Sequence, residues 1–356
     1  MPGLSFDGGV PMKFDCRQHL LGGQAIPALP LALKANRKWD ERSQAAVIRY
    51  YVDCGAGGLA VGVHSTQFAI RDPKFGLYEP VLSLAADVAR EWAGVLRPPC
   101  LIAGLCGLTR QAISEAVLAR SLGYHAGLLS LGAMAARSER EMIQHCREVA
   151  REIPLVGFYL QPAAGGLVLS RGFWSRFCDI GEVVAIKIAP FNRYRTVDVI
   201  RAVMETGRDD IALYTGNDDN IVADLITPFT FAGRTRFIDG GLLGHWGIWT
   251  RRAVELLGDI KAERKRARIR RRWLDKGAAI TDANAAIFDP ENDFSGCIPG
   301  IHEVLRRQGL FQSVACLDAG ERLSPGQAAA ISRVIKAYPW MIDDAFVERN
   351  LSRWRA

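Results

Sequence analysis

Lys187 is the residue of this sequence whose position most clearly suggests chemistry. It interrupts the apolar run VVAIKIAP, whose composition is typical of a strand buried on both faces. Burial disfavours the charged ammonium form and lowers the pKa of a lysine, so its amine can attack a carbonyl and form a Schiff base. The alternative is a lysine whose stem packs while its amine reaches the surface or pairs with a carboxylate. The run by itself favours neither interpretation.

Tyr159 is the second candidate, in LVGFYLQP at the end of the preceding apolar run. If both residues end neighbouring strands, the phenol could deliver and remove the protons that Schiff-base formation at Lys187 requires. Taken alone, a tyrosine in such a run is more often an amphipathic core residue.

Short apolar runs alternate with amphipathic stretches along the chain, as in parallel strands joined by helices. The expected strands are 24–33, 58–63, 100–104, 126–131, 154–160, 183–188, 211–215 and 236–239. Eight such units favour an α/β fold of the (β/α)8 TIM-barrel type over a doubly wound sheet. Lys187 would then lie near the carboxyl end of strand six, the face at which barrel active sites open.

After residue 258 the pattern predicts helices alone, at 260–286, 298–308, 324–336 and 341–353. We therefore expect a barrel catalytic domain at 1–258 and a C-terminal helical region at 259–356.

The chain resembles the dihydrodipicolinate synthase and N-acetylneuraminate lyase superfamily of class I aldolases and lyases, as a divergent member. The resemblance extends to about residue 310 and rests on five segments: DERSQAAVIRYYVDCGAGGLAVG, CLIAGLCGLTRQAISEAVLARSLGYHAGLL, PLVGFYLQP, VVAIKIA and LYTGNDD. It implies a (β/α)8 barrel with a helical extension, usually tetrameric, whose lysine forms a Schiff base with pyruvate or another 2-oxo acid. By that resemblance Lys187 is the Schiff-base residue and Tyr159 is the proton donor and acceptor.

The loop after the second strand departs from the family. The family's Gly-Thr-Thr-Gly-Glu falls on Val63, His64, Ser65, Thr66 and Gln67. Ser65 alone keeps a hydroxyl where the family has threonine, so it is a catalytic candidate. In the family this loop binds the substrate carboxylate partly through backbone N–H groups, so the resemblance makes His64 and Ser65 substrate-binding candidates. A lone histidine beside a strand end is, however, more often structural.

Two further departures concern the substrate. The family's Pro-Tyr-Tyr segment after strand four reads SLGAM here, without a second tyrosine, and the arginine position of the synthase falls on Ala164. An arginine fork commonly binds a second carboxylate, so its loss argues against dihydrodipicolinate synthesis itself. A sugar-acid derivative or another less charged substrate fits better.

Other polar residues at expected strand ends are weaker candidates. Asn192 follows strand six and could contact substrate, although loops are polar by default. Asp239 ends the expected eighth strand and could orient a substrate hydroxyl or pair with Lys187, while its neighbouring glycines suit a turn equally well. We interpret 217–219 as a helix cap rather than a metal site, because no convergent ligand set is visible.

The net charge of +7 lies in one run, residues 261–272. Polyanion binding is conceivable there, but without interleaved aromatics or a DNA-binding motif we do not expect nucleic acid as a partner. We interpret the run as the solvated face of one helix whose inner stripe includes Ile269, Trp273 and Leu274. The chain has no apolar run long enough to cross a membrane and its start does not resemble a signal peptide, so we expect a cytoplasmic protein without a membrane partner.

These observations predict a class I lyase or aldolase that forms a Schiff base through Lys187 on a small-molecule 2-oxo acid. We expect no metal, no cofactor and a homo-oligomer, either dimer or tetramer. A Schiff-base dehydratase of a keto-deoxy sugar acid is the nearest alternative, because the same imine serves both reactions. A catalytically inactive barrel acting as a ligand sensor is the alternative from another class.

Overall fold

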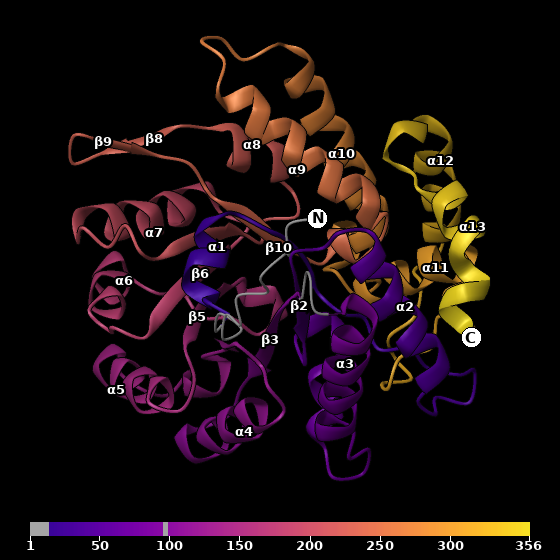
Figure 1. Cartoon of the computed structure of the whole chain (residues 1–356), viewed down its shortest axis with the longest axis horizontal. Coiled ribbons are helices and arrows are strands. Elements are labelled where there is room, and N and C mark those ends of the chain that lie inside the picture. Colours follow the sequence, from indigo (N-terminus) through magenta and orange to yellow (C-terminus); the bar gives the residue numbers. More distant parts are fainter. Residues whose placement is uncertain (1–13, 95–98) are drawn as a thin grey trace, which may run out of the picture.

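The computed structural model describes residues 14–94 and 99–356. Eight parallel strands form one sheet, in the order β1, β10, β7, β6, β5, β4, β3, β2. A parallel bridge between Ala28 and Ala60, with a 2.8 Å hydrogen bond from the Leu29 N–H to the Ala60 carbonyl, joins the two edge strands and closes the sheet (Figure 1). The predicted (β/α)8 barrel is confirmed.

The barrel strands are short and buried. Their bounds are β1 (Ala25–Pro27), β2 (Gly58–Val61), β3 (Cys100–Leu105), β4 (Ala126–Leu129), β5 (Leu155–Leu160), β6 (Val183–Ala189), β7 (Ala212–Thr215) and β10 (Gly240–Leu243). Helices follow the strands and surround them in Figure 1: α2 (Glu41–Asp53), α3 (Tyr78–Ala93), α4 (Thr109–Ser121), α5 (Glu139–Ala150), α6 (Arg171–Cys178), α7 (Arg193–Glu205), α8 (Ile221–Ile226) and α9 (Thr250–Arg264). Helix α1 (Cys16–Leu21) precedes β1 and contacts β6 and β7.

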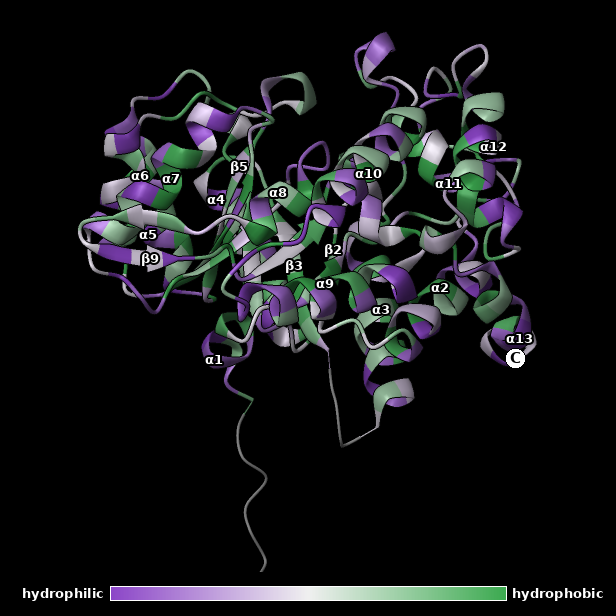
Figure 2. Ribbon diagram, turned by 90° about the horizontal axis from the view of Figure 1, so that it is seen from above, coloured by the Kyte–Doolittle hydropathy of each residue, from purple (hydrophilic) through white to green (hydrophobic). Residues whose placement is uncertain are grey.

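Two apolar clusters separate the inside of the barrel from its outside. Because side chains alternate along a strand, every second residue faces the interior. On β5 the inner cluster holds Val156, Phe158 and Leu160, whereas the outer cluster, between strands and helices, holds Leu155 and Tyr159. Figure 2 shows the apolar residues gathered on the strands and on the helix faces turned towards them.

The chain after the barrel is helical, as predicted. It contains α10 (Arg272–Phe288), α11 (Cys297–Arg307), α12 (Gln327–Ala337), the short helix η7 (Pro339–Met341) and α13 (Asp344–Arg355). These helices lie along one side of the barrel in Figure 1, and α13 packs against α2. The Tyr50 hydroxyl of α2 donates a 2.7 Å hydrogen bond to Asp343 at the start of α13. Position 258, the predicted domain boundary, lies within α9.

The structure corrects the expected eighth strand. Residues 234–236 form β9, which pairs antiparallel with β8 (Phe229–Phe231) outside the barrel, and the eighth barrel strand is β10. The sequence GGLL of β10 lacks the branched, apolar composition that marks a strand, but its glycines permit close packing against neighbouring groups. A Cβ on Gly241 would come within 2.5 Å of the Trp246 ring.

The expected single helix at 260–286 is also corrected. It is broken into α9 and α10 by residues 265–271, where the Arg270 N–H donates a 2.9 Å hydrogen bond to the buried Glu263 carboxylate. Ile269 and Leu274 are 44% and 74% exposed, so they form no inner stripe, whereas Trp273 is buried. Among the residues described, no helix combines the length and apolar character that a membrane span requires.

Candidate active site

A cavity of about 310 Å³ opens at the carboxyl ends of the barrel strands. His64 and Ser65 after β2, Lys187 on β6 and Asp218 after β7 line it. The C-terminal region contributes further wall residues from 288–301 and 320–321. The face at which barrel enzymes place their active sites therefore holds a concave site with titratable groups.

Lys187 lies in this cavity and is 8% exposed. Its Nζ is 4.6 Å from the centroid of the Phe158 ring. Burial lowers the pKa of Lys187 to about 8, although the nearby Asp218 carboxylate acts in the opposite direction. A larger fraction of the amine is therefore neutral near physiological pH than in a solvated lysine, as a nucleophilic amine requires.

Gly216 makes room for the lysine stem. A Cβ at this position would lie 2.6 Å from Lys187 Cε and 2.8 Å from the Ala189 Cβ. The backbone at the end of β7 can therefore approach β6 this closely only because residue 216 is glycine. This contact explains a glycine of the LYTGNDD segment that the sequence alone left without a role.

Asp218 is the carboxylate that faces Lys187. Burial raises its pKa to about 7, against the opposing effects of Lys187 and of a hydrogen bond from the His245 N–H, 2.8 Å from Oδ1. The predicted helix-cap role of residues 217–219 is wrong, because the N-cap residue of α8 is Asn220. Asp218 is thus a candidate acid and base that sequence reasoning missed, because LYTGNDD offered no means of telling a cap from a catalytic group.

His64 and Ser65, the two substrate-binding candidates of the loop after β2, line the cavity together with Lys187. Burial, with a smaller contribution from Lys187, lowers the pKa of His64 to about 4, so its imidazole is neutral. The Ser65 hydroxyl donates a 3.2 Å hydrogen bond to the Leu29 carbonyl. The backbone N–H groups of these two residues, at the start of helix η1 (His64–Thr66), bond to no other group in the described part of the chain.

Tyr159 is not brought to Lys187. Its hydroxyl donates a 3.1 Å hydrogen bond to the Leu169 carbonyl, and its ring lies 5.2 Å from that of Trp174 in the outer cluster. The cause is a register shift between β5 and β6: Leu155 pairs with Val183, but Val156 pairs with Ala185. Val184 is the extra residue, as in a β-bulge, and from there on Phe158 lies opposite Lys187.

Asn192 and Asp239 do not line the cavity either. The Asn192 side chain caps α7 by accepting a 3.2 Å hydrogen bond from the Arg195 N–H, a common role for asparagine before a helix. Asp239 precedes β10 and accepts a 2.8 Å hydrogen bond from the N–H of Leu213, at the amino-terminal half of β7. It therefore lies towards the end of the barrel opposite the cavity, because β10 starts later than the predicted strand.

Glu321 is a lining residue with no signal in the sequence. Burial raises the pKa of its carboxyl, against the lowering effect of a hydrogen bond from Cys316. Its buried Oε2 has no hydrogen-bond partner among the residues described. It comes from an irregular segment between α11 and α12, far from the barrel strands in sequence, so only the folded chain could place it in the site.

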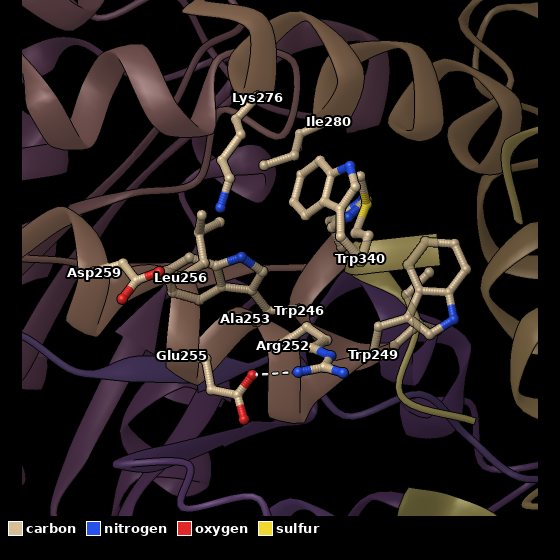
Figure 3. A pocket seen from close by; sticks show the side chains of 13 residues that line it. Trp246, Trp249, Arg252, Ala253, Glu255, Leu256, Asp259, Lys276, Ile280 and Trp340 are labelled. Atoms are coloured by element: carbon tan, nitrogen blue, oxygen red, sulfur yellow. Dashed lines mark hydrogen bonds and ion pairs between the residues drawn. The ribbon is translucent and has the colours of Figure 1, made fainter. Parts of the chain in front are cut away.

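A second, smaller cavity of about 190 Å³ lies between α9, α10 and η7 (Figure 3). Figure 3 shows the rings of Trp246, Trp249 and Trp340 around it, with the ion pair between Arg252 and Glu255 at one side. Lys276, the lysine of its lining, lies 5.0 Å from the Trp340 ring centroid. Lys276 belongs to α10, whereas Lys187 lies on β6 at the end of the barrel where barrel enzymes place their active sites, so the cavity at Lys187 is the better candidate for imine chemistry.

Known proteins resemble this chain in sequence over a short stretch and in structure over most of its length. No family model matches the sequence. A stretch of 116 residues is 31% identical to the 4-hydroxy-tetrahydrodipicolinate synthase of Clostridium novyi (strain NT); it covers 32% of this chain. The match thus spans only 38% of the length of that curated relative.

Solved structures resemble almost the whole chain at low sequence identity. N-acetylneuraminate lyase from Fusobacterium nucleatum has a TM-score of 0.70 and 17% identity, covering 89% of this chain and 99% of its own. The same lyase complexed with pyruvate has a TM-score of 0.67 and 16% identity, covering 90% of this chain and 98% of its own. Dihydrodipicolinate synthase from Aquifex aeolicus has a TM-score of 0.71 and 19% identity, covering 90% of this chain and 99% of its own. The chain has the (β/α)8 fold of the dihydrodipicolinate synthase and N-acetylneuraminate lyase family of class I aldolases, and its sequence is distantly similar to that family.

Proposed function

We propose that the protein is a class I lyase or aldolase whose Lys187 forms a Schiff base with a 2-oxo acid. One observation carries the proposal: a buried lysine with a lowered pKa lies in the cavity at the carboxyl end of the barrel, beside a buried carboxyl with a raised pKa. Titratable groups whose pKa values are strongly perturbed by burial and by a charge partner in a cleft are candidates for a functional site. The likeness to a lyase solved with pyruvate supports a 2-oxo acid as the substrate.

The proposed chemistry assigns a role to each group. The neutral amine of Lys187 attacks the keto carbon, and the carboxylic acid of Asp218 protonates the oxygen that leaves as water when the imine forms. The Asp218 carboxylate then accepts the proton lost from the adjacent carbon as the enamine forms. Asp218 thereby takes the part that the family resemblance gave to Tyr159. The free N–H groups of His64 and Ser65 are the proposed partners of the substrate carboxylate.

The lining supports a substrate other than that of dihydrodipicolinate synthase. Ala164 lines the cavity, and the lining residues described include no arginine that could bind a second carboxylate. The sugar-acid derivative predicted from the sequence remains a proposal, and so does its dehydration in place of carbon–carbon cleavage, because the imine serves either reaction. We favour an enzyme over a ligand sensor without turnover, because a buried lysine and a buried carboxyl both line the cavity.

Borohydride trapping tests the proposal. The protein is reduced in the presence of pyruvate, other 2-oxo acids and 2-oxo-3-deoxy sugar acids, and the adduct is located by intact mass and peptide mapping. We expect one adduct on Lys187, lost in Lys187→Ala and retained in the control Lys276→Ala, whose lysine lies in the second cavity. Equal trapping by Lys187→Ala, or no trapping with any 2-oxo acid, would refute the Schiff-base function.

Assembly and location are further proposals. By resemblance to the family, we propose a cytoplasmic homo-oligomer, either dimer or tetramer, without nucleic-acid or membrane partners. Light scattering of the purified chain measures the mass of the assembly, and a monomer at all accessible concentrations would contradict the proposal.

A further inference from the structure

Two cysteine sulfurs are in contact at the amino-terminal end of the barrel, opposite the Lys187 cavity. Sγ of Cys16, the first residue of α1, lies 3.5 Å from Sγ of Cys100, the first residue of β3. All eight cysteines lie in the described part of the chain as free thiols, and this is the one pair there whose sulfurs are in hydrogen-bond contact with each other. The two residues are 84 positions apart in sequence, so the fold alone brings them together.

Helix α1 is held against the barrel by contacts with other strands. Arg17 donates a 3.0 Å hydrogen bond to the Val183 carbonyl, at the start of β6. The Tyr214 hydroxyl of β7 donates a 2.8 Å hydrogen bond to the Leu20 carbonyl. Figure 1 shows α1 beside β6, with which it packs. These contacts fix the helix relative to the strands, and both cysteines belong to the inner apolar cluster.

The two sulfurs need only a short movement to form a bond. A disulfide has an S–S bond of about 2.0 Å, so the sulfurs must approach each other by about 1.5 Å. Cys100 is fixed in β3, because its N–H donates a 3.0 Å hydrogen bond to the Gly57 carbonyl. Cys16 belongs to a helix of six residues outside the sheet. The movement therefore falls mainly to the Cys16 side chain and its short helix.

Of the two thiols, Cys16 is the one that an oxidant can reach. A cavity of about 760 Å³ opens at the amino ends of β4, β5 and β6, where His125, Pro154 and Glu182 line it. Cys16 also lines this cavity, whereas Cys100 is fully buried and is not among the lining residues that the structure describes. An accessible thiol in contact with a second thiol that can resolve its oxidised form is common among redox-sensing cysteines.

We propose that Cys16 and Cys100 form a redox modification site, at which a peroxide produces a reversible disulfide that ties α1 to β3. In a reducing compartment such a disulfide is transient, and the thiol pair is the resting form. The site lies at the other end of the barrel from Lys187 and does not depend on the proposed Schiff-base function.

The reaction balances with a peroxide as the oxidant. The Cys16 sulfur attacks one peroxide oxygen, the O–O bond breaks, and Cys16 becomes a sulfenic acid as water or an alcohol leaves. The Cys100 sulfur then attacks the sulfenic sulfur, the S–S bond forms, and the second oxygen leaves as water. The two thiols together lose two hydrogen atoms, which the peroxide gains. A dithiol reverses the change by thiol–disulfide exchange and is itself oxidised to a disulfide.

The disulfide would connect positions 84 residues apart, on either side of β1, α2, β2 and α3. Such a cross-link restricts the unfolded chain, and in the chain-entropy model its stabilising effect grows with the length of the loop. It also keeps α1 attached to the barrel for as long as β3 is folded. We therefore expect the oxidised protein to resist heat better than the reduced protein.

Thiol counting after oxidation tests the proposal. The full-length protein is treated with hydrogen peroxide, denatured and alkylated with iodoacetamide, and its intact mass is measured. We expect six alkylated cysteines in place of eight, and eight again after the oxidised protein is treated with dithiothreitol. Eight alkyl groups after peroxide treatment, or sulfinic acid at Cys16 without a cross-link, would overturn the proposal.

Peptide mapping locates the cross-link. Trypsin should yield Cys16 in peptide 14–17 and Cys100 in peptide 91–110, and the disulfide should join these two peptides. Because the second peptide also contains Cys106, the matched control is Cys106→Ser, which should keep the cross-link. Cys16→Ser and Cys100→Ser should each lose it. A cross-link between any other two cysteines of the parent protein would contradict the assignment, even if one of the variants failed to fold.

Thermal unfolding measures what the cross-link does. Oxidation is expected to raise the Tm of the parent protein and of Cys106→Ser by about 5 °C, and to leave that of Cys16→Ser unchanged. A mapped disulfide between Cys16 and Cys100 that leaves the Tm of the parent unchanged would overturn the proposed tie between α1 and the barrel.

Discussion

The ring of Phe158 lies beside the amine of Lys187, with Nζ 4.6 Å from the ring centroid, and the two residues are opposite each other in the pairing of β5 with β6. The apolar ring keeps water away from the amine on that side and so contributes to the burial that lowers the pKa of Lys187. In the proposed mechanism the proton chemistry therefore falls to Asp218, the buried carboxyl with a raised pKa in the same cavity.

Replacement of Tyr159 tests this division of roles. We expect Tyr159→Phe to form the Lys187 imine at about the parental rate, whereas loss of a general acid typically costs about 10² to 10⁴-fold. The variant loses the hydrogen bonds with Leu169, so its free energy of unfolding should fall by about 1 kcal/mol. Deuterium exchange into the methyl group of pyruvate measures the rate, and urea unfolding measures the stability. A hundredfold slower exchange in the folded variant would return the relay role to Tyr159.

The pH dependence tests the pair formed by Lys187 and Asp218. The pKa values are about 8 for Lys187 and about 7 for Asp218, so between pH 7 and pH 8 the two residues together hold one proton. In a minor fraction of this singly protonated pair, the proton is on the carboxyl group and the amine is neutral. We expect the exchange rate to rise as pH increases through about 7 and to fall above about 8. A profile that rises steadily to alkaline pH would show that Asp218 does not act as the acid.

Asp218→Asn should change the shape of this profile. The variant has no acid at this position, so we expect rates lower by about 10²-fold or more and no falling limb. Because the Asp218 carboxylate raises the pKa of Lys187, its removal should move the remaining inflection below that of the parent. Intact mass after trapping measures whether the lysine still reacts, and a retained bell-shaped profile would point to another acid.

Gly216→Ala tests the fit of the lysine stem. The added Cβ would lie 2.6 Å from Lys187 Cε, so the lysine must move, and a misplacement of about 1 Å commonly costs about 10²-fold in rate. Overpacking should also destabilise the fold by about 1–3 kcal/mol. Gly258→Ala is the matched control, because a Cβ there meets no heavy atom within 4 Å and the position lies in α9. The control should retain the rate and gain about 1 kcal/mol of stability.

The basic run at 261–272 gives a prediction about partners. Lys261 and Arg264 donate hydrogen bonds of 2.7 Å to the Gly22 and Ile238 carbonyls, and Arg270 pairs with Glu263, so part of its charge is used within the fold. We expect binding to a short DNA duplex no tighter than about 10⁻⁴ M at physiological salt, the weak end of non-specific binding. Fluorescence anisotropy checks this expectation.

The control for that experiment neutralises the exposed arginines of the same run, with the substitutions Arg268→Gln, Arg271→Gln and Arg272→Gln. The combined variant should bind duplex as weakly as the parent. Micromolar, salt-dependent binding that this variant loses would identify the run as a nucleic-acid site.

The composition and periodicity of the sequence determined the fold class. Apolar runs separated by amphipathic stretches predict parallel strands and crossover helices, because a strand buried on both faces and a helix buried on one carry different local patterns. Lys187 could be singled out for the same reason, since a charged residue within such a run needs an explanation. Two segments with weak local patterns were misassigned, GGLL at β10 and the arginine-rich break between α9 and α10. The first of these errors also placed Asp239 at the wrong end of the barrel.

Only the tertiary structure decided which side chains meet. One extra residue, Val184, changes the partner of Lys187 from Tyr159 to Phe158, and strand periodicity then turns the tyrosine hydroxyl out of the barrel. No local pattern marks such a bulge. Phe294 and Glu321 reach the cavity from distant irregular segments, through contacts between parts of the chain that no short stretch of sequence encodes. The sequence thus singled out Lys187 and determined the barrel that holds it, whereas long-range packing decided which carboxyl and which rings lie in the cavity with it.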